Sequence, residues 1–170
     1  MSAARKPEGP EVIEEEVERR AGGIYGTIVA AGVLVAAGDP SGGAPVDAVD
    51  AGIYAVVTTV VFWLAHGFSL ALARRAAGHP AASPRVTLSR EWPMVAATVP
   101  LLAIMAVASL LGASDETAIN AAVWGSIVVL GSLGVTIARR EGVSRTQAVG
   151  TVLGCAALGG LLVLLKVVVH

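Results

Sequence analysis

The sequence predicts an all-α polytopic membrane protein with five transmembrane helices. Its 170 residues are 55% hydrophobic and only 15% charged, whereas a soluble domain carries roughly 25% charged residues to cover its surface. The apolar residues also gather in five stretches, each near the roughly 20 residues that a helix needs to cross a bilayer. Helices are the expected form of these stretches, because a helix satisfies its own backbone hydrogen bonds in lipid.

Short segments rich in proline, glycine or charge separate the five expected spans. The spans cover approximately residues 21–38, 48–73, 92–112, 117–138 and 147–169. Residues 1–20 are expected to form a charged cytoplasmic tail that contains a short acidic helix. Residues 21–170 are expected to form the five-helix transmembrane domain, with the lipid bilayer as its main partner.

The basic residues predict the orientation of the chain. Eleven of the 12 lysines and arginines lie in the N-terminal tail, in the connection between spans two and three, and in the turn between spans four and five. The positive-inside rule places these segments in the cytoplasm, so the N-terminus is expected inside and the C-terminus outside. The remaining base, Lys166, is expected to snorkel to the outer interface. The bias toward arginine, alanine, valine and glycine favours a bacterial inner membrane.

His66 is the one ionisable residue expected deep in a span. Thr59 and Ser69 fall on roughly the same face of the second helix, so the three residues are candidates to line a conduction or proton path. Ionisable groups inside a membrane are costly and often functional, and histidine titrates near neutral pH. The alternative is a neutral imidazole that is hydrogen-bonded to a neighbouring helix.

Proline and small residues predict how the helices bend and pack. Pro100 lacks an N–H inside the third span, so a kink is expected there. Small residues four apart let helix backbones approach closely in lipid. Two such pairs are Gly22 with Gly26 and Gly150 with Gly154. Packing within one bundle and a homodimer seam both remain open as explanations for these pairs.

The N-terminal helix carries four carboxylates on one face, at positions that are three and four residues apart. These residues are Glu11, Glu14, Glu15 and Glu18. Oxygen ligands of this kind could hold a hard cation. The alternative is a solvated helix with ion pairs at spacing four.

No motif predicts an enzyme, a cofactor or nucleic-acid binding. The sequence has no glycine-rich phosphate loop, no H-E-x-x-H and no G-x-S-x-G. The 13 acidic and 12 basic residues nearly cancel, so no strong field attracts nucleic acid. The single cysteine, Cys155, lies in an apolar helix without the electropositive surroundings that activate a thiol.

Two stretches resemble the vacuolar iron transporter family. Ile24-Tyr25-Gly26, followed by Gly32, is similar to the aromatic-glycine start of that family's first helix, and residues 140–145 running into Gly150 and Gly154 resemble its basic turn and glycine-rich last helix. The resemblance extends over about residues 19–169 in topology. It implies a five-helix bundle and a dimer.

The residues of that family's metal path are replaced in this chain. The carboxylate position of the first helix holds Val29, and the methionine and glutamate positions of the second helix correspond to Phe62 and His66. The connection over residues 74–90 contains no acid. An iron path built from oxygen ligands is therefore not expected.

These observations together predict a small transporter or channel-like protein, probable partner a second copy of itself. The alternative is a non-transporting membrane subunit that scaffolds or regulates a partner complex. Water-accessible polar residues on the second span favour transport, whereas a dry bundle with one exposed small-residue face favours the subunit.

Overall fold

The described structure is a computed structural model. It describes residues 10–38, 46–76, 84–141 and 145–169, without the side chains of residues 10–20 and of scattered positions after residue 136. Its elements are α1 (Pro10–Ala37), α2 (Ala48–Ala76), α3 (Pro84–Arg90), α4 (Trp92–Ala96), α5 (Thr98–Leu110), α6 (Asp115–Glu141) and α7 (Arg145–Val169). No strand occurs in these residues, so the predicted all-α class is confirmed.

Three helical stretches are long and apolar enough to cross a membrane. They are Ala48–Ala76, Arg85–Leu110 and Asp115–Thr136, and two shorter apolar stretches cover Ala21–Ala37 and Thr146–Leu161 within the described residues. All five expected spans are thus helical, and three of them meet the length for crossing. The five-span topology and its orientation stay predictions.

Two of the helices differ from the sequence-based expectation. The acidic segment is not a separate short helix, because α1 runs unbroken from Pro10 to Ala37. Neither proline nor glycine interrupts the chain between Pro10 and Gly22, so helix propagates through these residues.

The third span is divided into α3, α4 and α5, with breaks at Glu91 and Ala97. Each break comes shortly before a proline. Pro93 lies in the first turn of α4, and Pro100 lies in the first turn of α5. The missing proline N–H is harmless in a first turn, so each proline sits where a new helix begins.

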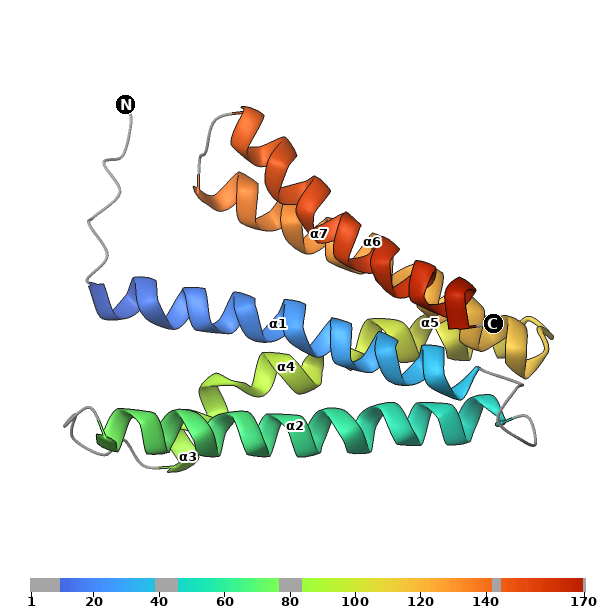
Figure 1. Ribbon diagram of the computed structural model, residues 1–170, viewed down its shortest axis with the longest axis horizontal. Helices are drawn as coiled ribbons and strands as arrows, with labels where there is room; N and C mark the ends of the chain where they lie inside the picture. The colour runs from blue at the N-terminus through green and yellow to red at the C-terminus, as the bar shows by residue number, and fades with distance from the viewer. Residues whose placement is uncertain (1–9, 39–45, 77–83, 142–144, 170) are drawn as a thin grey trace.

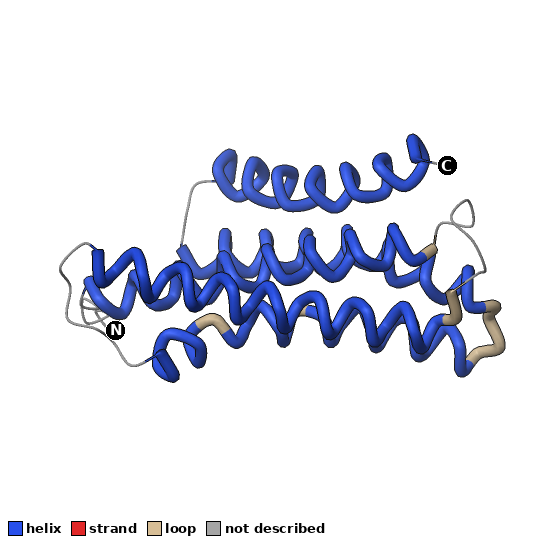
Figure 2. Tube along the Cα trace, turned by 60° about the horizontal axis from the view of Figure 1, so that its bottom comes forward, coloured by secondary structure: helices blue, strands red, loops and turns tan. Residues whose placement is uncertain are grey.

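The helices form an elongated bundle in which α1 and α2 run side by side and α4 lies between them (Figure 1). The α6–α7 pair crosses α1 at an angle and comes close to it at the end where the C-terminus lies. Figure 2 shows α7 at the edge of the bundle, above the other helices. Helix α7 packs mainly against α6 and also touches α1.

The continuous apolar core occupies one end of this bundle. It joins the last turns of α1, the first turns of α2 and α6, part of α5 and one residue of α7. Its members are Ala30, Ala31, Leu34, Val35, Ala48, Ala51, Ala55, Leu101, Met105, Ala118, Ile119, Ala122, Val123 and Val163. Most of them are small, so the helices pack closely. We call this end the closed end.

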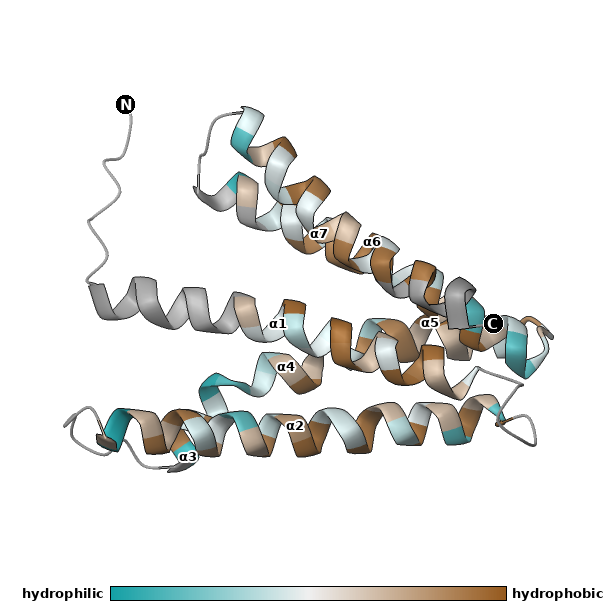
Figure 3. Cartoon of the chain, viewed as in Figure 1, coloured by the Kyte–Doolittle hydropathy of each residue, from teal (hydrophilic) through white to brown (hydrophobic). Residues whose placement is uncertain are grey.

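The helix surfaces are apolar along their middles and polar at their ends. Figure 3 shows this pattern clearly on α2 and α6. Many large apolar side chains are exposed, including Phe68, Trp124, Val128 and Leu153. Exposed apolar surface on this scale is expected for helices that face lipid.

Candidate functional site

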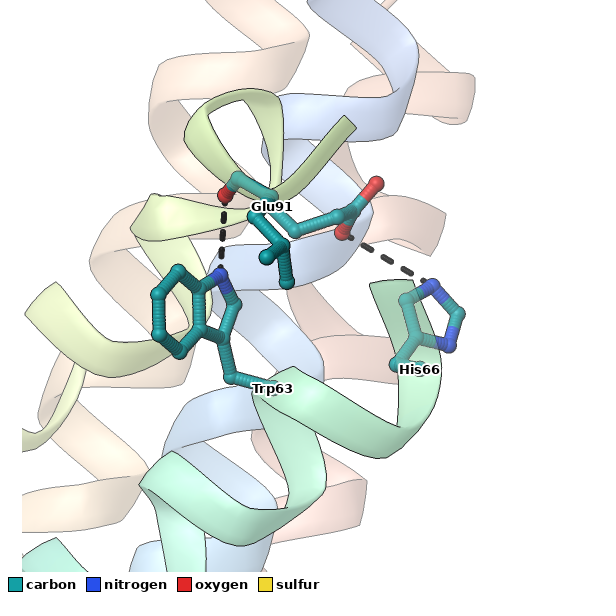
Figure 4. Close-up of polar contacts among 4 residues, drawn as sticks. Trp63, His66 and Glu91 are labelled. Atoms are coloured by element: carbon teal, nitrogen blue, oxygen red, sulfur yellow. Dashed lines mark hydrogen bonds and ion pairs between the residues drawn. The ribbon is translucent and has the colours of Figure 1, made fainter. Parts of the chain in front are cut away.

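Three helices meet around a buried carboxylate at the end opposite the closed end. The side chain of Glu91, between α3 and α4, is only 3% exposed, and its Oε2 lies 3.7 Å from Nε2 of His66 on α2 (Figure 4). The side chain of His66 is 50% exposed. A Cβ atom on Gly22 of α1 would lie 3.5 Å from the same Oε2, so the backbone of α1 lies against the carboxylate.

Contacts between α2 and α3 place Glu91 opposite His66. The indole Nε1 of Trp63 donates a hydrogen bond of 2.9 Å to the carbonyl oxygen of Leu88 (Figure 4). Gly67, one turn further along α2, leaves room for the Leu88 side chain, since a Cβ atom there would lie 2.7 Å from Leu88 Cδ2. Trp63 also meets the ring of Trp92 edge to face at 5.7 Å. These contacts hold the residues on both sides of Glu91.

Helix α1 reaches the site through a second close approach. A Cβ atom on Gly26 would overlap the Met94 carbonyl oxygen and would lie 2.7 Å from the Met94 carbonyl carbon. The α1 backbone therefore rests directly on the backbone of α4. Gly22 and Gly26 thus pack within the bundle, on the helix that follows Glu91.

Aromatic rings cover the open side of His66. Tyr25 on α1 is stacked with the imidazole at a centroid distance of 6.3 Å, and it also lies 6.3 Å from the ring of Phe62 on α2. Tyr25 and Phe62 are 46% and 42% exposed. The carboxylate is therefore shielded by a layer of three rings that are themselves accessible from outside the bundle.

The protonation of His66 sets the strength of its contact with Glu91. A separation of 3.7 Å exceeds a direct hydrogen bond but lies within the range of an ion pair. A neutral imidazole gains little at this distance, whereas an imidazolium is attracted by the carboxylate and by the face of Tyr25. Proton binding to His66 therefore strengthens the contact between α2 and the α3–α4 junction.

A second buried polar group lies one turn before Glu91. The hydroxyl of Thr87 has no hydrogen-bond partner among the described residues, although the residue is only 1% exposed. The backbone N–H of Glu91 donates to the Thr87 carbonyl oxygen at 3.3 Å, so the two residues are successive on one face. An unsatisfied buried hydroxyl costs stability, which makes Thr87 an informative position for mutation.

The predicted polar stripe on α2 is divided by the structure. Thr59 is buried in the bundle, and its hydroxyl donates to the Ala55 carbonyl oxygen of its own helix at 2.8 Å. His66 and Ser69 are exposed. Only His66 contacts a charged partner in another helix. Thr27 and Ser126 also donate to carbonyl oxygens of their own helices.

The glycine pairs that were expected to pack helices have different surroundings. Gly22 and Gly26 face Glu91 and Met94 within the bundle, whereas a Cβ atom on Gly150 or Gly154 would meet nothing within 4 Å. The α6–α7 contact instead uses Gly159, where a Cβ atom would lie 2.9 Å from Ile127 Cα. Gly150 and Gly154 therefore lie on an open face of α7.

The expected carboxylate face of the N-terminal helix lies outside the described side chains. Residues Glu11, Glu14, Glu15 and Glu18 belong to α1, and their side chains are not described. Among the described residues, no group of three or more histidine, cysteine, aspartate or glutamate side chains is placed to hold a metal ion.

Sequence reasoning missed Glu91 as the partner of His66. The third span was expected to begin at Trp92, so Glu91 was assigned to the connection, and the spans were thought to contain no acid. The apolar stretch in fact runs from Arg85 to Leu110 and includes Glu91. A signal was present: Trp63 and Trp92 each lie within three residues of one member of the pair, as is typical of residues at one membrane depth.

Comparisons of this chain with protein-family models, with curated proteins and with solved structures find no match. The resemblance to the vacuolar iron transporter family therefore stays a prediction.

Proposed function

We propose that this chain is an integral membrane protein that acts as a small transporter or channel-like protein, with His66 and Glu91 as its proton-binding pair. The observation that carries the proposal is the 3.7 Å contact between a half-exposed imidazole and a buried carboxylate. Ionisable groups held inside a membrane domain are expensive, and they mark proton relays and substrate paths.

The position of the pair along its helices supports a site at the inner mouth of such a path. His66 lies about 27 Å along α2 from Ala48, at 1.5 Å per residue. Glu91 lies roughly 28 Å from Leu110 along the broken third span. The hydrocarbon core is about 30 Å thick, so the pair sits close to the membrane face that carries the arginines of residues 74–90. The orientation from the positive-inside rule makes this face cytoplasmic.

Passage through the bundle requires the closed end to open. That end is filled with small apolar side chains, and the hydroxyls of Thr27, Thr59 and Ser126 are bonded to their own helices. No polar residue must lose a partner in another helix when these helices separate. In alternating access, the site stays in place while the two ends open in turn.

Proton movement into liposomes tests this proposal. Protein reconstituted with an entrapped pH dye is exposed to a membrane potential set by potassium and valinomycin. We expect lumenal acidification with the wild type, loss of acidification with Glu91→Gln and strong reduction with His66→Ala. Ser69→Ala is the matched control, because Ser69 is exposed on the same helix and should leave the rate unchanged. Acidification no faster than in protein-free liposomes would refute the proton path.

A second function is favoured by the open face of α7. Gly150 and Gly154 meet no other helix, and Val149, Leu153 and Leu161 nearby are exposed. Small residues four apart on an unpacked face are suited to close contact with another helix in lipid. This face supports a membrane subunit that associates through α7 with a second copy or with another protein.

Oligomer size in detergent tests the association. Gly154→Leu should lower the oligomer fraction, because the larger side chain keeps a partner backbone away. Gly32→Leu on α1 is a control, since a Cβ atom there also meets nothing within 4 Å. An unchanged oligomer fraction with Gly154→Leu would remove this face from consideration.

A further inference from the structure

We propose that the site around Glu91 binds an organic ammonium-type cation in exchange for the proton on His66. This inference rests on the proposed transport function and names its substrate class. It is carried by two features that lie together: a carboxylate that is almost fully buried, and a half-exposed layer of rings from Tyr25, Phe62 and His66 in front of it.

The carboxylate needs a positive partner to remain ionised at this burial. The cost of an unpaired charge in an apolar environment is several kcal/mol (about 2–5 kcal/mol in practice). Protonated His66 is such a partner, and it lies 3.7 Å away. When the imidazole loses its proton, this partner becomes neutral, and the site gains by taking up another cation.

The rings determine which cation fits. Cations are attracted to the faces of aromatic rings, and weakly hydrated organic cations benefit most because they lose little hydration on entering. Tyr25 already stacks with the imidazole at 6.3 Å, with an interplanar angle of 29°. The place that an imidazolium occupies between the Tyr25 face and Glu91 is therefore shaped for a flat or bulky cation with delocalised charge.

Access to the carboxylate requires movement of His66 only. The imidazole is half exposed on α2, so rotation about its side-chain bonds takes it toward the outside of the bundle. The arriving cation then contacts Tyr25 and Phe62 and pairs with Glu91. The exchange conserves charge, because the proton leaves the imidazole nitrogen for water as the organic cation arrives.

The titratable groups that contact His66 come from two other elements. They are Tyr25 on α1 and Glu91 at the junction of α3 and α4. Arg90 precedes Glu91 in the chain, and Arg74 lies two turns beyond His66 on α2. Tyrosine and arginine keep one protonation state between pH 5.5 and 8.0, so the expected pH dependence arises from His66.

Calorimetric titration of the detergent-purified full chain with tetraphenylphosphonium tests the inference. The affinity should rise about tenfold from pH 5.5 to pH 8.0, because a proton on a histidine with the reference pKa of about 6.5 competes at the lower pH only. His66→Asn should bind with equal affinity at both pH values. A pH dependence that persists in His66→Asn would overturn the exchange.

Two further variants test the recognition of the cation. Glu91→Gln should abolish binding, and Tyr25→Leu should weaken it about fivefold or more, as expected for a cation–π contact of about 1 kcal/mol. Tyr25→Phe keeps the ring and should bind nearly as well as the wild type. Tyr54→Leu is the matched control, because Tyr54 is an exposed tyrosine near the start of α2.

The isosteric anion tetraphenylborate separates charge recognition from partition into the apolar surface. It should show no saturable binding. Equal binding of the anion, or unchanged binding of the cation to both Glu91→Gln and Tyr25→Leu, would overturn the inference. Proton movement without cation binding would leave the proposed transport function standing with another substrate, whereas cation binding without any flux would leave the site standing and remove transport.

Discussion

The contact between Gly26 and Met94 offers the sharpest test of how the site is assembled. A methyl group added at Gly26 would overlap the Met94 carbonyl oxygen, and it would lie 2.7 Å from the carbonyl carbon and 2.9 Å from Cα of Met94. Carbon atoms in contact prefer about 3.5–4.0 Å. Because backbone atoms cannot rotate out of the way, Gly26→Ala must push α1 and α4 apart by roughly 1 Å.

The expected cost follows from two opposing effects. Overpacking of a well-packed interior costs typically about 1–3 kcal/mol, and replacing a helical glycine by alanine returns up to about 1 kcal/mol. Gly26→Ala should therefore lower the free energy of unfolding by about 1–2 kcal/mol. Denaturation in mixed micelles, followed by circular dichroism, measures this change. Movement of α4 also shifts Glu91, so tetraphenylphosphonium affinity should fall in the same variant.

Gly32→Ala is the matched control on the same helix. A Cβ atom at Gly32 meets nothing within 4 Å, so only the helix-forming advantage of alanine remains. This variant should be as stable as the wild type or slightly more stable. If Gly26→Ala is as stable as Gly32→Ala, the close approach of α1 to α4 does not exist in the folded protein, and the position assigned to Glu91 loses its support.

Three other predictions test the site and the topology. Trp63→Phe removes the indole donor to the Leu88 carbonyl oxygen and should cost about 1 kcal/mol in the same unfolding assay; no change would show that the bond does not contribute. Thr87→Val replaces an unsatisfied buried hydroxyl and should leave stability unchanged or raised, whereas a clear loss would reveal a partner for the hydroxyl. An impermeant thiol reagent added outside cells should label cysteines in two of the four connections and spare the other two: Ser41→Cys and Asp115→Cys react, and Ser83→Cys and Ser144→Cys do not. The reverse pattern would refute the proposed orientation.

The helical elements could be predicted because their signals are local. Runs of apolar residues fix where a helix can cross lipid, and prolines fix where one must begin or end. The main misjudged boundary shows the limit of this reasoning. Residues 10–20 are charged and so looked separate from the first span, but charge does not end a helix, and α1 continues through them.

The pairing of His66 with Glu91 could not be read from local signals. The two residues are separated by the end of α2, by the connection and by α3, so their contact depends on how α3 folds back on α2. That fold depends on the bond from Trp63 to Leu88 and on the space above Gly67. None of these contacts leaves a periodic pattern in the sequence. The same holds for Gly159, whose contact with Ile127 was obscured by the more regular spacing of Gly150 and Gly154.

The uneven packing of the bundle connects the two proposed functions. Small residues fill the closed end, whereas large rings stand half exposed around Glu91 at the other end. A bundle that served only as a scaffold gains nothing from a buried carboxylate at its loosely packed end, because apolar residues of similar volume would be at least as stable there. An exposed face on α7 does not conflict with transport, since that face lies on another side of the bundle from His66. Association through α7 holds α6 and α7 against a partner, and α1 to α5 then move relative to them. The pair at Glu91 thus argues for transport, and the α7 face argues for the assembly in which that transport takes place.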